Sequence, residues 1–238
     1  MNLLGIDTAT PVTSVAVGSE AGTLASVAVR NDRAHAELLA PAVRWALDQA
    51  GIEAGSLGGV AVGVGPGLFT GLRVGVATAK ALAQAWKLRM VAVSSLDLVA
   101  FAHREAPKSI CAVLDARRGE VFAALYRRVP GGVQRITEPV ALRPDQLAAG
   151  LEARRERVLL CGDGAHVHAD VFERTLTQYD LGSLAQAAPS AGCLVELALP
   201  RFHREDTVAP FEVTPLYLRR PDVDPSLERR LAAERVRA

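Results

Sequence analysis

The sequence predicts a two-lobed α/β protein whose lobes repeat one order of elements, β-β-β-α-β-α. Two observations predict this fold class. Short β-branched runs, typical of buried strands, alternate with longer segments in which apolar residues recur at helical spacing. The order of elements then returns in the second half, and each copy opens on a strand that ends in an aspartate, Asp7 and then Asp115. We therefore expect lobes over residues 1–100 and 101–220, followed by a flexible tail over residues 221–238.

In the first lobe, glycine and proline separate the apolar runs. Glu20-Ala21-Gly22 predicts a hairpin, and Gly51 predicts the end of the first helix. Gly65-Pro66-Gly67 separates a buried strand from a long helix, at whose start Thr70 stands where an N-cap is expected. The lobe is thus predicted to contain three strands, a helix, a strand, a helix and a strand, over residues 3–6, 13–18, 23–29, 34–50, 60–64, 70–87 and 90–93.

The second lobe shows the same kind of separation. Arg117-Arg118-Gly119 and Pro130-Gly131-Gly132 predict turns between successive strands. A helix near residues 191–203 is also expected, with the first lobe as one surface on which it could pack. The predicted elements are three strands, a helix, a strand and two helices, over residues 110–114, 121–126, 133–140, 144–153, 158–161, 167–179 and 191–202.

The stretch over residues 58–86 organises the chain, because its helix is apolar on more than one side. At about 100° per residue, the polar side chains of this helix fall on one narrow stripe. Two apolar flanks remain, the Leu72 flank (Leu72, Val76, Ala79, Ala83, Trp86) and the Val74 flank (Val74, Ala77, Ala81, Ala85). A helix that covers one sheet needs only one apolar face. We expect one flank to pack on its own sheet and the other to meet a partner's helices, and the sequence does not say which.

Composition and charge exclude several classes of protein. The formal net charge is +1, half of the residues are apolar and 22% are charged, which gives no global indication of nucleic acid or an acidic membrane as a partner. The three cysteines lie far apart in apolar contexts, unlike a disulfide framework or a metal knuckle. No stretch is long enough to span a bilayer, and no basic region precedes an apolar run at the N-terminus. We expect a cytoplasmic protein without a membrane partner.

Few residues could carry chemistry. No two histidines have the i, i+4 spacing of a metal-binding helix face, so no metal site is expected. His35 could be a ligand, but a capping or interface residue is the more common reading. In two-lobed nucleotide-binding folds, aspartates placed like Asp7 and Asp115 orient metal and water at the phosphates. The alternative is that each aspartate caps its own turn. A weak ATP or ADP site would comprise Asp7, Thr8, Asp115, Gly162 and Gly164.

Four segments of the chain resemble the TsaB (YeaZ) family. They are L-L-G-I-D-T-A-T at residues 3–10, G-V-G-P-G-L-F-T-G-L-R-V-G-V-A-T-A-K-A-L-A at 63–83, V-L-D-A-R-R-G-E-V-F at 113–122 and T-P-L-Y-L-R-R-P-D at 214–222. The resemblance implies an actin-like fold of the sugar-kinase and Hsp70 type. It also implies a role in making threonylcarbamoyladenosine beside the tRNA anticodon.

The resemblance further implies that the chain is not itself an enzyme. TsaB proteins are non-catalytic partners of a TsaD-like subunit, which carries the metal and transfers the threonylcarbamoyl group. A TsaE-like ATPase is a further expected partner, and tRNA is expected to be contacted only through the complex. The metal-binding H-x-x-x-H of the catalytic relative falls near Ser95 and Val99 here, and neither side chain suits a transition metal.

The main hypothesis is a scaffold subunit that activates a TsaD-like subunit by helix-to-helix pairing and forms a homodimer when alone. No cofactor is required in this hypothesis. Two alternatives remain open: a module that holds ATP or ADP without turning it over, and an actin-like phosphotransferase or peptidase that acts on its own. The expected interface comprises His35, Leu39, Val43, Thr70, Gly71, Val74, Gly75, Ala77, Thr78 and Ala81.

Overall fold

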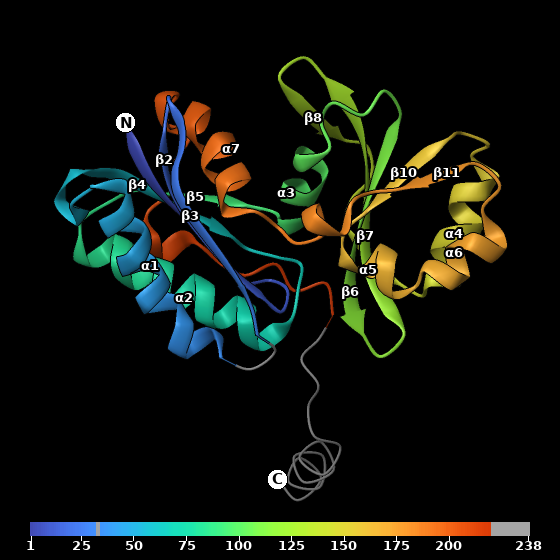
Figure 1. Ribbon diagram of the computed structural model, residues 1–238, viewed down its shortest axis with the longest axis horizontal. Helices are drawn as coiled ribbons and strands as arrows, with labels where there is room; N and C mark the ends of the chain where they lie inside the picture. Colours follow the sequence, from blue (N-terminus) through green and yellow to red (C-terminus); the bar gives the residue numbers. More distant parts are fainter. Residues whose placement is uncertain (32–33, 220–238) are drawn as a thin grey trace, which may run out of the picture.

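The computed structural model describes residues 1–31 and 34–219 and contains two β-sheets that lie side by side, each with helices on both faces (Figure 1). The first sheet has the strand order β3-β2-β1-β4-β5. Its three N-terminal strands pair antiparallel, and β4 and β5 extend the sheet in parallel with β1. The bounds are Asn2–Asp7 for β1, Val12–Ser19 for β2, Gly22–Arg30 for β3, Leu57–Gly63 for β4 and Met90–Val93 for β5.

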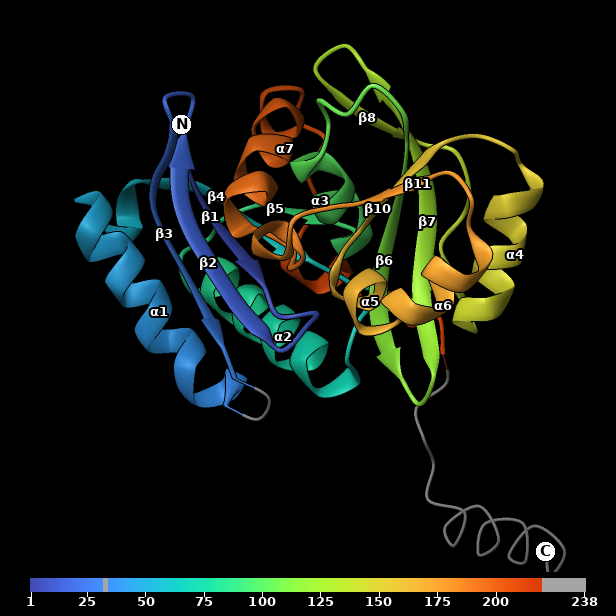
Figure 2. The ribbon, with the colours of Figure 1, turned by 45° about the vertical axis from the view of Figure 1, so that its right-hand side comes forward.

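Helices cover both faces of the first sheet (Figure 2). The helices α1 (His35–Ala50) and α2 (Phe69–Ala85) pack on one face, and α7 (Ala191–His203) packs on the other. Successive strand residues point to opposite faces, so Leu4 belongs to the core under α1 and α2, whereas Leu3 belongs to the core under α7. Because both faces are covered, the central strands read as continuous apolar runs.

The second sheet has the strand order β11-β10-β6-β7-β8, and β9 also pairs with β7. On one face it is covered by α4, α5 and α6, with Phe172 fully buried between helix and sheet. The strands are Ser109–Arg117 (β6), Glu120–Val129 (β7), Gly132–Arg135 (β8), Val140–Leu142 (β9), Val158–Cys161 (β10) and Tyr179–Leu181 (β11). The helices are Pro144–Ala153 (α4), Asp163–Val167 (α5) and Ala169–Thr175 (α6). Short 3-10 helices lie at Ala54–Ser56, Leu184–Gln186 and Pro210–Glu212.

The helix α3 (Ser95–Ala102) covers the opposite face of the second sheet. Leu96 and Val99 pack there against strand β6, although the sequence assigned residues up to 100 to the first lobe. A charged cluster reinforces the contact, because Asp97 accepts hydrogen bonds from Tyr126 at 2.7 Å and from Arg135 Nη2 at 2.7 Å. The chain therefore enters the second lobe at α3, and α7 brings it back to the first sheet.

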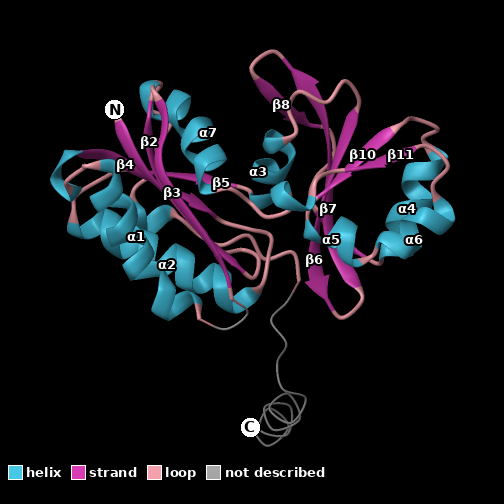
Figure 3. Ribbon diagram, in the orientation of Figure 1, coloured by secondary structure: helices cyan, strands magenta, loops and turns pink. Residues whose placement is uncertain are grey.

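Most predicted elements are present, and three predictions were wrong (Figure 3). In the segment 167–179, predicted as one helix, only Ala169–Thr175 forms a helix of its own (α6), while residue 167 ends α5 and residue 179 begins the strand β11. The strand predicted over residues 133–140 is two short strands, β8 and β9. Thr70 is not an N-cap, because Leu68 precedes the first helical residue and no side chain caps it. The helix α3 was not predicted, and the tail over residues 221–238 lies outside the described residues.

Candidate docking surface

The Leu72 flank of α2 covers the first sheet. Leu72, Val76 and Ala79 are 1%, 3% and 0% exposed, and Val76 and Ala79 belong to the core that also contains strand residues of β1 and β4. The sequence left open which flank faces the sheet. The structure assigns the Leu72 flank to it.

Glycines let α2 approach the turn after β1. A Cβ added at Gly71 would overlap the carbonyl oxygen of Thr8, and one added at Gly75 would overlap Thr8 Oγ1. The Thr8 hydroxyl donates a hydrogen bond to the Gly71 carbonyl at 2.7 Å. Both glycines were expected at the interface with a partner. In the structure both permit a close contact within the chain, where a side chain does not fit.

The Val74 flank of α2 faces away from the sheet. Val74 is half-buried, and Ala77 and Ala81 are exposed. Thr70 and Thr78 were also expected at the interface. Thr70 is exposed, and Thr78 is half-buried. Among the residues that the structure describes, these positions form an apolar strip along the outer side of the helix.

The expected interface residues of α1 lie inside the chain. His35, Leu39 and Val43 are 7%, 1% and 5% exposed, and the two apolar side chains belong to the core under α1 and α2. The His35 Nδ1 atom lies 2.7 Å from the Thr13 hydroxyl. A side chain that is already buried offers a partner little surface, so the structure gives these residues a role within the chain, and their contact with a partner stays a prediction. Their side chains hold α1 on the sheet.

A groove of about 440 Å³ separates the outer sides of α1 and α2. It continues the apolar strip, because Thr78 and Leu82 of α2 line it together with Ala40 of α1. Its charged rim residues come from α1 and the segment after it. The further lining residues are Val43, Arg44, Leu47, Asp48, Ile52, Glu53, Ala54 and Trp86.

Asp7, the last residue of β1, and Asp115, which lies within β6 two residues before its end, each cap their own turn. Oδ1 of Asp7 accepts the backbone N–H of Ala9 at 2.9 Å, and Oδ1 of Asp115 accepts that of Arg117 at 2.9 Å. In both lobes the carboxylate accepts the N–H of the residue two positions later, as in an Asx turn. Asp7 is 0% exposed, and burial raises its pKa to about 6. This geometry matches the turn-capping alternative, and the Asp7 carboxylate has no surface that a ligand could reach.

The other residues of the expected nucleotide site are engaged in packing. Gly162 has a φ of 108°, and a Cβ there would overlap the Val113 carbonyl oxygen. A Cβ at Gly164 would lie 2.7 Å from the Leu114 carbonyl carbon. Both glycines therefore permit α5 to lie against β6. The structure does not gather Asp7, Thr8, Asp115, Gly162 and Gly164 around one cavity among those found in the described residues.

Ser95 and Val99, expected from the sequence to stand where a catalytic relative binds metal, have structural roles here. Ser95 is fully buried at the start of α3, and its hydroxyl donates a hydrogen bond to Oδ2 of Asp7 at 2.7 Å. Val99 is fully buried in the core of the second sheet. Within residues 1–31 and 34–219, no group of three or more histidines, cysteines and carboxylates could hold a metal ion.

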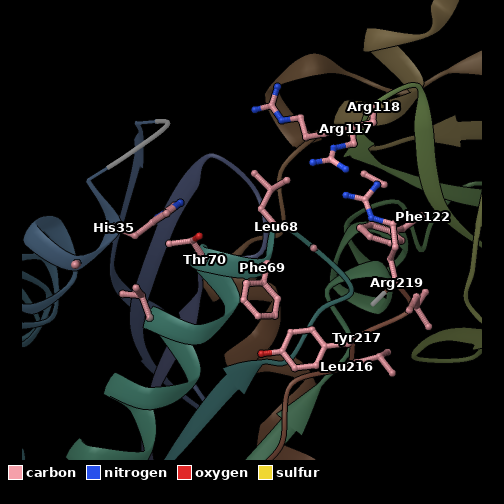
Figure 4. Close-up of a pocket in the computed structure, with 16 residues that line it drawn as sticks. His35, Leu68, Phe69, Thr70, Arg117, Arg118, Phe122, Leu216, Tyr217 and Arg219 are labelled. Carbon is pink, nitrogen blue, oxygen red and sulfur yellow. The ribbon is translucent and has the colours of Figure 1, made fainter. Parts of the chain in front are cut away.

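The sequence analysis missed a cavity of about 420 Å³ between the two lobes (Figure 4). Arg117 and Arg118 of the turn between β6 and β7 line it, together with Arg219. The start of α2 forms the wall on the side of the first lobe. The adjacent arginines were visible in the sequence, but they were interpreted only as part of a turn. Their proximity to α2 depends on how the lobes meet.

Comparison with known proteins relates most of the chain to one family. The sequence model of TsaD, tRNA N6-adenosine threonylcarbamoyltransferase, matches residues 23–224. The TsaB protein of Escherichia coli (strain K12) is 30% identical over 222 residues, which cover 92% of this chain and 95% of that protein. The TsaB protein of Bacillus subtilis (strain 168) is 32% identical over 196 residues, which cover 79% of this chain and 83% of that protein. Both relatives are described as tRNA threonylcarbamoyladenosine biosynthesis proteins.

Solved structures show the same relation. A Pseudomonas aeruginosa protein described as similar to the peptidase YeaZ superposes with a TM-score of 0.79 at 31% identity, over 92% of this chain and 99% of that one. The ethanolamine utilization protein EutJ of Carboxydothermus hydrogenoformans superposes with a TM-score of 0.55 at 11% identity, over 82% of this chain and 90% of that one. The second likeness concerns the fold alone. The predicted actin-like fold class is confirmed. In the part of the chain that the structure describes, no helix combines the length and apolar character needed to cross a membrane.

Proposed function

Because this chain belongs to the TsaB (YeaZ) family, we propose that it acts in tRNA threonylcarbamoyladenosine biosynthesis as a non-catalytic subunit that pairs with a TsaD-like transferase. The observation that carries the pairing is the Val74 flank of α2. Its alanines are exposed and Val74 is only half-buried at the edge of the core, although the flank is apolar along several turns. An apolar strip beside a groove is the kind of surface that buries itself against another helix.

The proposed contact surface is narrower than the one expected from the sequence. It keeps Thr70, Val74, Ala77, Thr78 and Ala81 of α2 and adds the outer side of α1 around Ala40 and Arg44. Small side chains at positions 77 and 81 let a partner helix approach α2 closely, as in the tighter helix pairs of small bundles. The partner's helices would lie along α1 and α2 and cover the groove between them.

The proposed role is positioning rather than chemistry. Asp7 and Asp115 are engaged in their own turns, which favours a role without ATP hydrolysis at these carboxylates. We expect no metal and no tightly held nucleotide at these two residues. In this proposal the subunit works in the cytoplasm, tRNA and a TsaE-like ATPase join through the assembled complex, and two copies pair through the same flank when the partner is absent.

Charge placed on the Val74 flank tests the proposal. In co-expression with a TsaD-like subunit, we expect wild type to be recovered as a heterodimer and Ala81→Glu to be recovered alone. The matched control is Ala153→Glu on α4, which also converts an exposed helical alanine and should pair normally. Thermal melting of each variant verifies its folding. Normal pairing of a folded Ala81→Glu variant would contradict the proposed surface.

A reconstituted transfer assay tests the non-catalytic role. The chain alone should transfer no threonylcarbamoyl group to tRNA, whereas its addition should stimulate the TsaD-like subunit. Ala81→Glu should fail to stimulate, and Ala153→Glu should stimulate like wild type. Robust transfer by the isolated chain would overturn the proposal and restore the enzyme alternative.

A further inference from the structure

The second lobe contains an apolar cavity away from the docking surface. It measures about 280 Å³ and lies between α4 and the strands β7 and β9. On the second sheet, α4 lies on the side away from the first lobe (Figure 1). The cavity is therefore separate from the Val74 flank of α2 and from the cavity between the lobes.

Apolar side chains from helix and sheet form the walls of this cavity. Leu147 and Leu151 of α4 line it together with Ala123 and Leu125 of β7, and all four belong to the core of the second lobe. Cys111 of β6, which is fully buried, also lines it. Alanine at position 123 contributes only a methyl group, which leaves space between helix and sheet. Cavities with such walls hold small apolar groups rather than water.

Gly150 keeps the cavity open on the side of the helix. It lies within α4, lines the cavity and is exposed, and a Cβ built there would meet no atom within 4 Å. Glycine is unfavourable inside a helix, and neither close packing nor a positive φ requires it here. Gln146 and Arg154 line the cavity one turn before and one turn after it. A longer side chain at position 150 would lie between them, over the opening.

Polar groups of both signs stand at the mouth of the cavity. Glu138 lines it, and within residues 1–31 and 34–219 its carboxylate has no hydrogen bond or ion pair. Nη2 of Arg154 lies 3.9 Å from Oε2 of Glu156, which is too long for a hydrogen bond. Oε1 of Gln146 accepts the backbone N–H of Arg143 at 3.2 Å, which leaves its NH2 group as a donor. The mouth therefore offers one carboxylate and two donors.

The segment that carries Glu138 is fixed to the sheet. The N–H of Ile136 donates to the carbonyl of Leu125 at 2.7 Å, and the hydroxyl of Thr137 accepts the N–H of Leu125 at 3.0 Å. Strand β9 begins two residues after Glu138, at Val140. Because the chain is held on both sides of Glu138, a ligand does not have to order a loop in order to reach its carboxylate.

We propose that this cavity binds a free α-amino acid with an apolar side chain. The side chain enters between α4 and β7, the ammonium group meets Glu138, and the carboxylate meets Gln146 and Arg154. A cavity of roughly 150 Å³ holds benzene. The larger volume found here leaves room for a ring and the carbon atoms beside it.

An amino acid matches this lining better than a hydrocarbon or a simple carboxylate does. A hydrocarbon meets neither charge at the mouth, and a carboxylate without an ammonium group leaves Glu138 without a partner. The site goes beyond the proposed function and shares no residue with the proposed contact surface.

Calorimetric titration of the isolated chain with L-phenylalanine tests the site. We expect saturable binding of one molecule per chain with a negative heat-capacity change, because apolar surface is buried. Gly150→Leu should bind at least ~10-fold more weakly, because its side chain occupies the opening. The matched control Gly150→Ala adds only a methyl group and should bind like wild type. Both variants should melt no lower than wild type, because leucine and alanine favour a helix over glycine.

Glu138→Gln separates recognition of the ammonium group from the filling of the cavity. It should weaken the binding of L-phenylalanine by about 2–5-fold, as expected for one exposed ion pair. It should not weaken the binding of 3-phenylpropionate, which has no ammonium group. Glu173→Gln removes an exposed carboxylate of α6 that does not line the cavity, and it should change neither affinity.

Three results would overturn the site: no binding of L-phenylalanine to wild type, equal binding by Gly150→Leu, and binding of 3-phenylpropionate as tight as that of L-phenylalanine. None of them bears on pairing through the Val74 flank, which is measured separately.

Discussion

The hydroxyl of Ser95 donates a hydrogen bond to Oδ2 of Asp7 across 2.7 Å, and this contact joins the first residue of α3 to the last residue of β1. Oδ1 of the same carboxylate accepts the N–H of Ala9. Burial raises the pKa of Asp7 from 3.8 to about 6, and the hydrogen bonds from Ala9 and Ser95 oppose that rise. The core therefore contains a carboxyl group whose neutral form is favoured in the folded chain.

The first prediction concerns the pH dependence of stability. With a folded pKa of about 6 and an unfolded value near 3.8, protonation of Asp7 favours the folded chain. This contribution is fully present below about pH 3.8 and is lost as the pH rises through about 6, with a total of roughly 3 kcal/mol. Asp7→Asn stays neutral and can still accept from Ala9. We expect it to raise the free energy of unfolding at pH 8 and to change it little at pH 4.

Urea denaturation of both proteins at the two pH values measures this difference. Asp48→Asn, on the exposed side of α1, controls for the loss of one acidic group and should change stability by no more than about 0.5 kcal/mol. If Asp7→Asn changes stability equally at pH 4 and pH 8, the burial of this carboxylate is not linked to folding in the way described.

The second prediction contrasts the two flanks of α2. Val76→Glu buries a charge without a partner against the first sheet and should unfold the chain or lower its stability by several kcal/mol. Ala81→Glu places the same charge in solvent and should change stability by about 0.5 kcal/mol or less. Circular dichroism melts and size-exclusion chromatography compare the two variants. Equal melting of both would mean that α2 does not pack as described.

The third prediction concerns the contact between Gly75 and Thr8. A methyl group at position 75 would overlap Thr8 Oγ1, so Gly75→Ala should destabilise the chain by about 1–3 kcal/mol. In a Thr8→Ala background the overlapping atom is absent, and the cost of Gly75→Ala should fall. A double-mutant cycle from denaturation curves measures this coupling.

Gly150→Ala is the matched control for that cycle. It lies within α4, and a Cβ there would meet no atom within 4 Å. Replacing this helical glycine by alanine should stabilise the chain by roughly 0.5–1 kcal/mol. If Gly75→Ala stabilised the chain as Gly150→Ala does, the close approach of α2 to the turn after β1 would be refuted.

The fourth prediction separates the two aspartates at the strand ends from nucleotide chemistry. Titration of the chain with ATP and Mg²⁺ should give the same result for wild type and for Asp7→Asn, because the Asp7 carboxylate is 0% exposed. Loss of ATP binding in a folded Asp7→Asn variant would favour the nucleotide-binding alternative.

The local sequence was sufficient to predict the bounds of two short apolar strands and of a helix that begins at a proline. The strand Met90–Val93, the helix Pro144–Ala153 and the strand Val158–Cys161 have the predicted bounds. The helix α3 was missed because most of its side chains are buried, so its sequence carries little of the polar and apolar alternation that marks a surface helix. An amphipathic pattern arises only where one side of a helix is exposed to solvent. Because α3 lies between the two lobes, it has no such side.

The sequence by itself determined that α2 has two apolar flanks, that Asp7 and Asp115 follow equivalent apolar runs, and that the chain resembles one family. Only the tertiary structure decided which flank is covered, that Leu39 and Val43 belong to the core, and that Arg117 and Arg118 face the start of α2. The reason is physical. Periodicity reports how side chains are distributed around one element, whereas burial depends on segments far away in the sequence that pack against it.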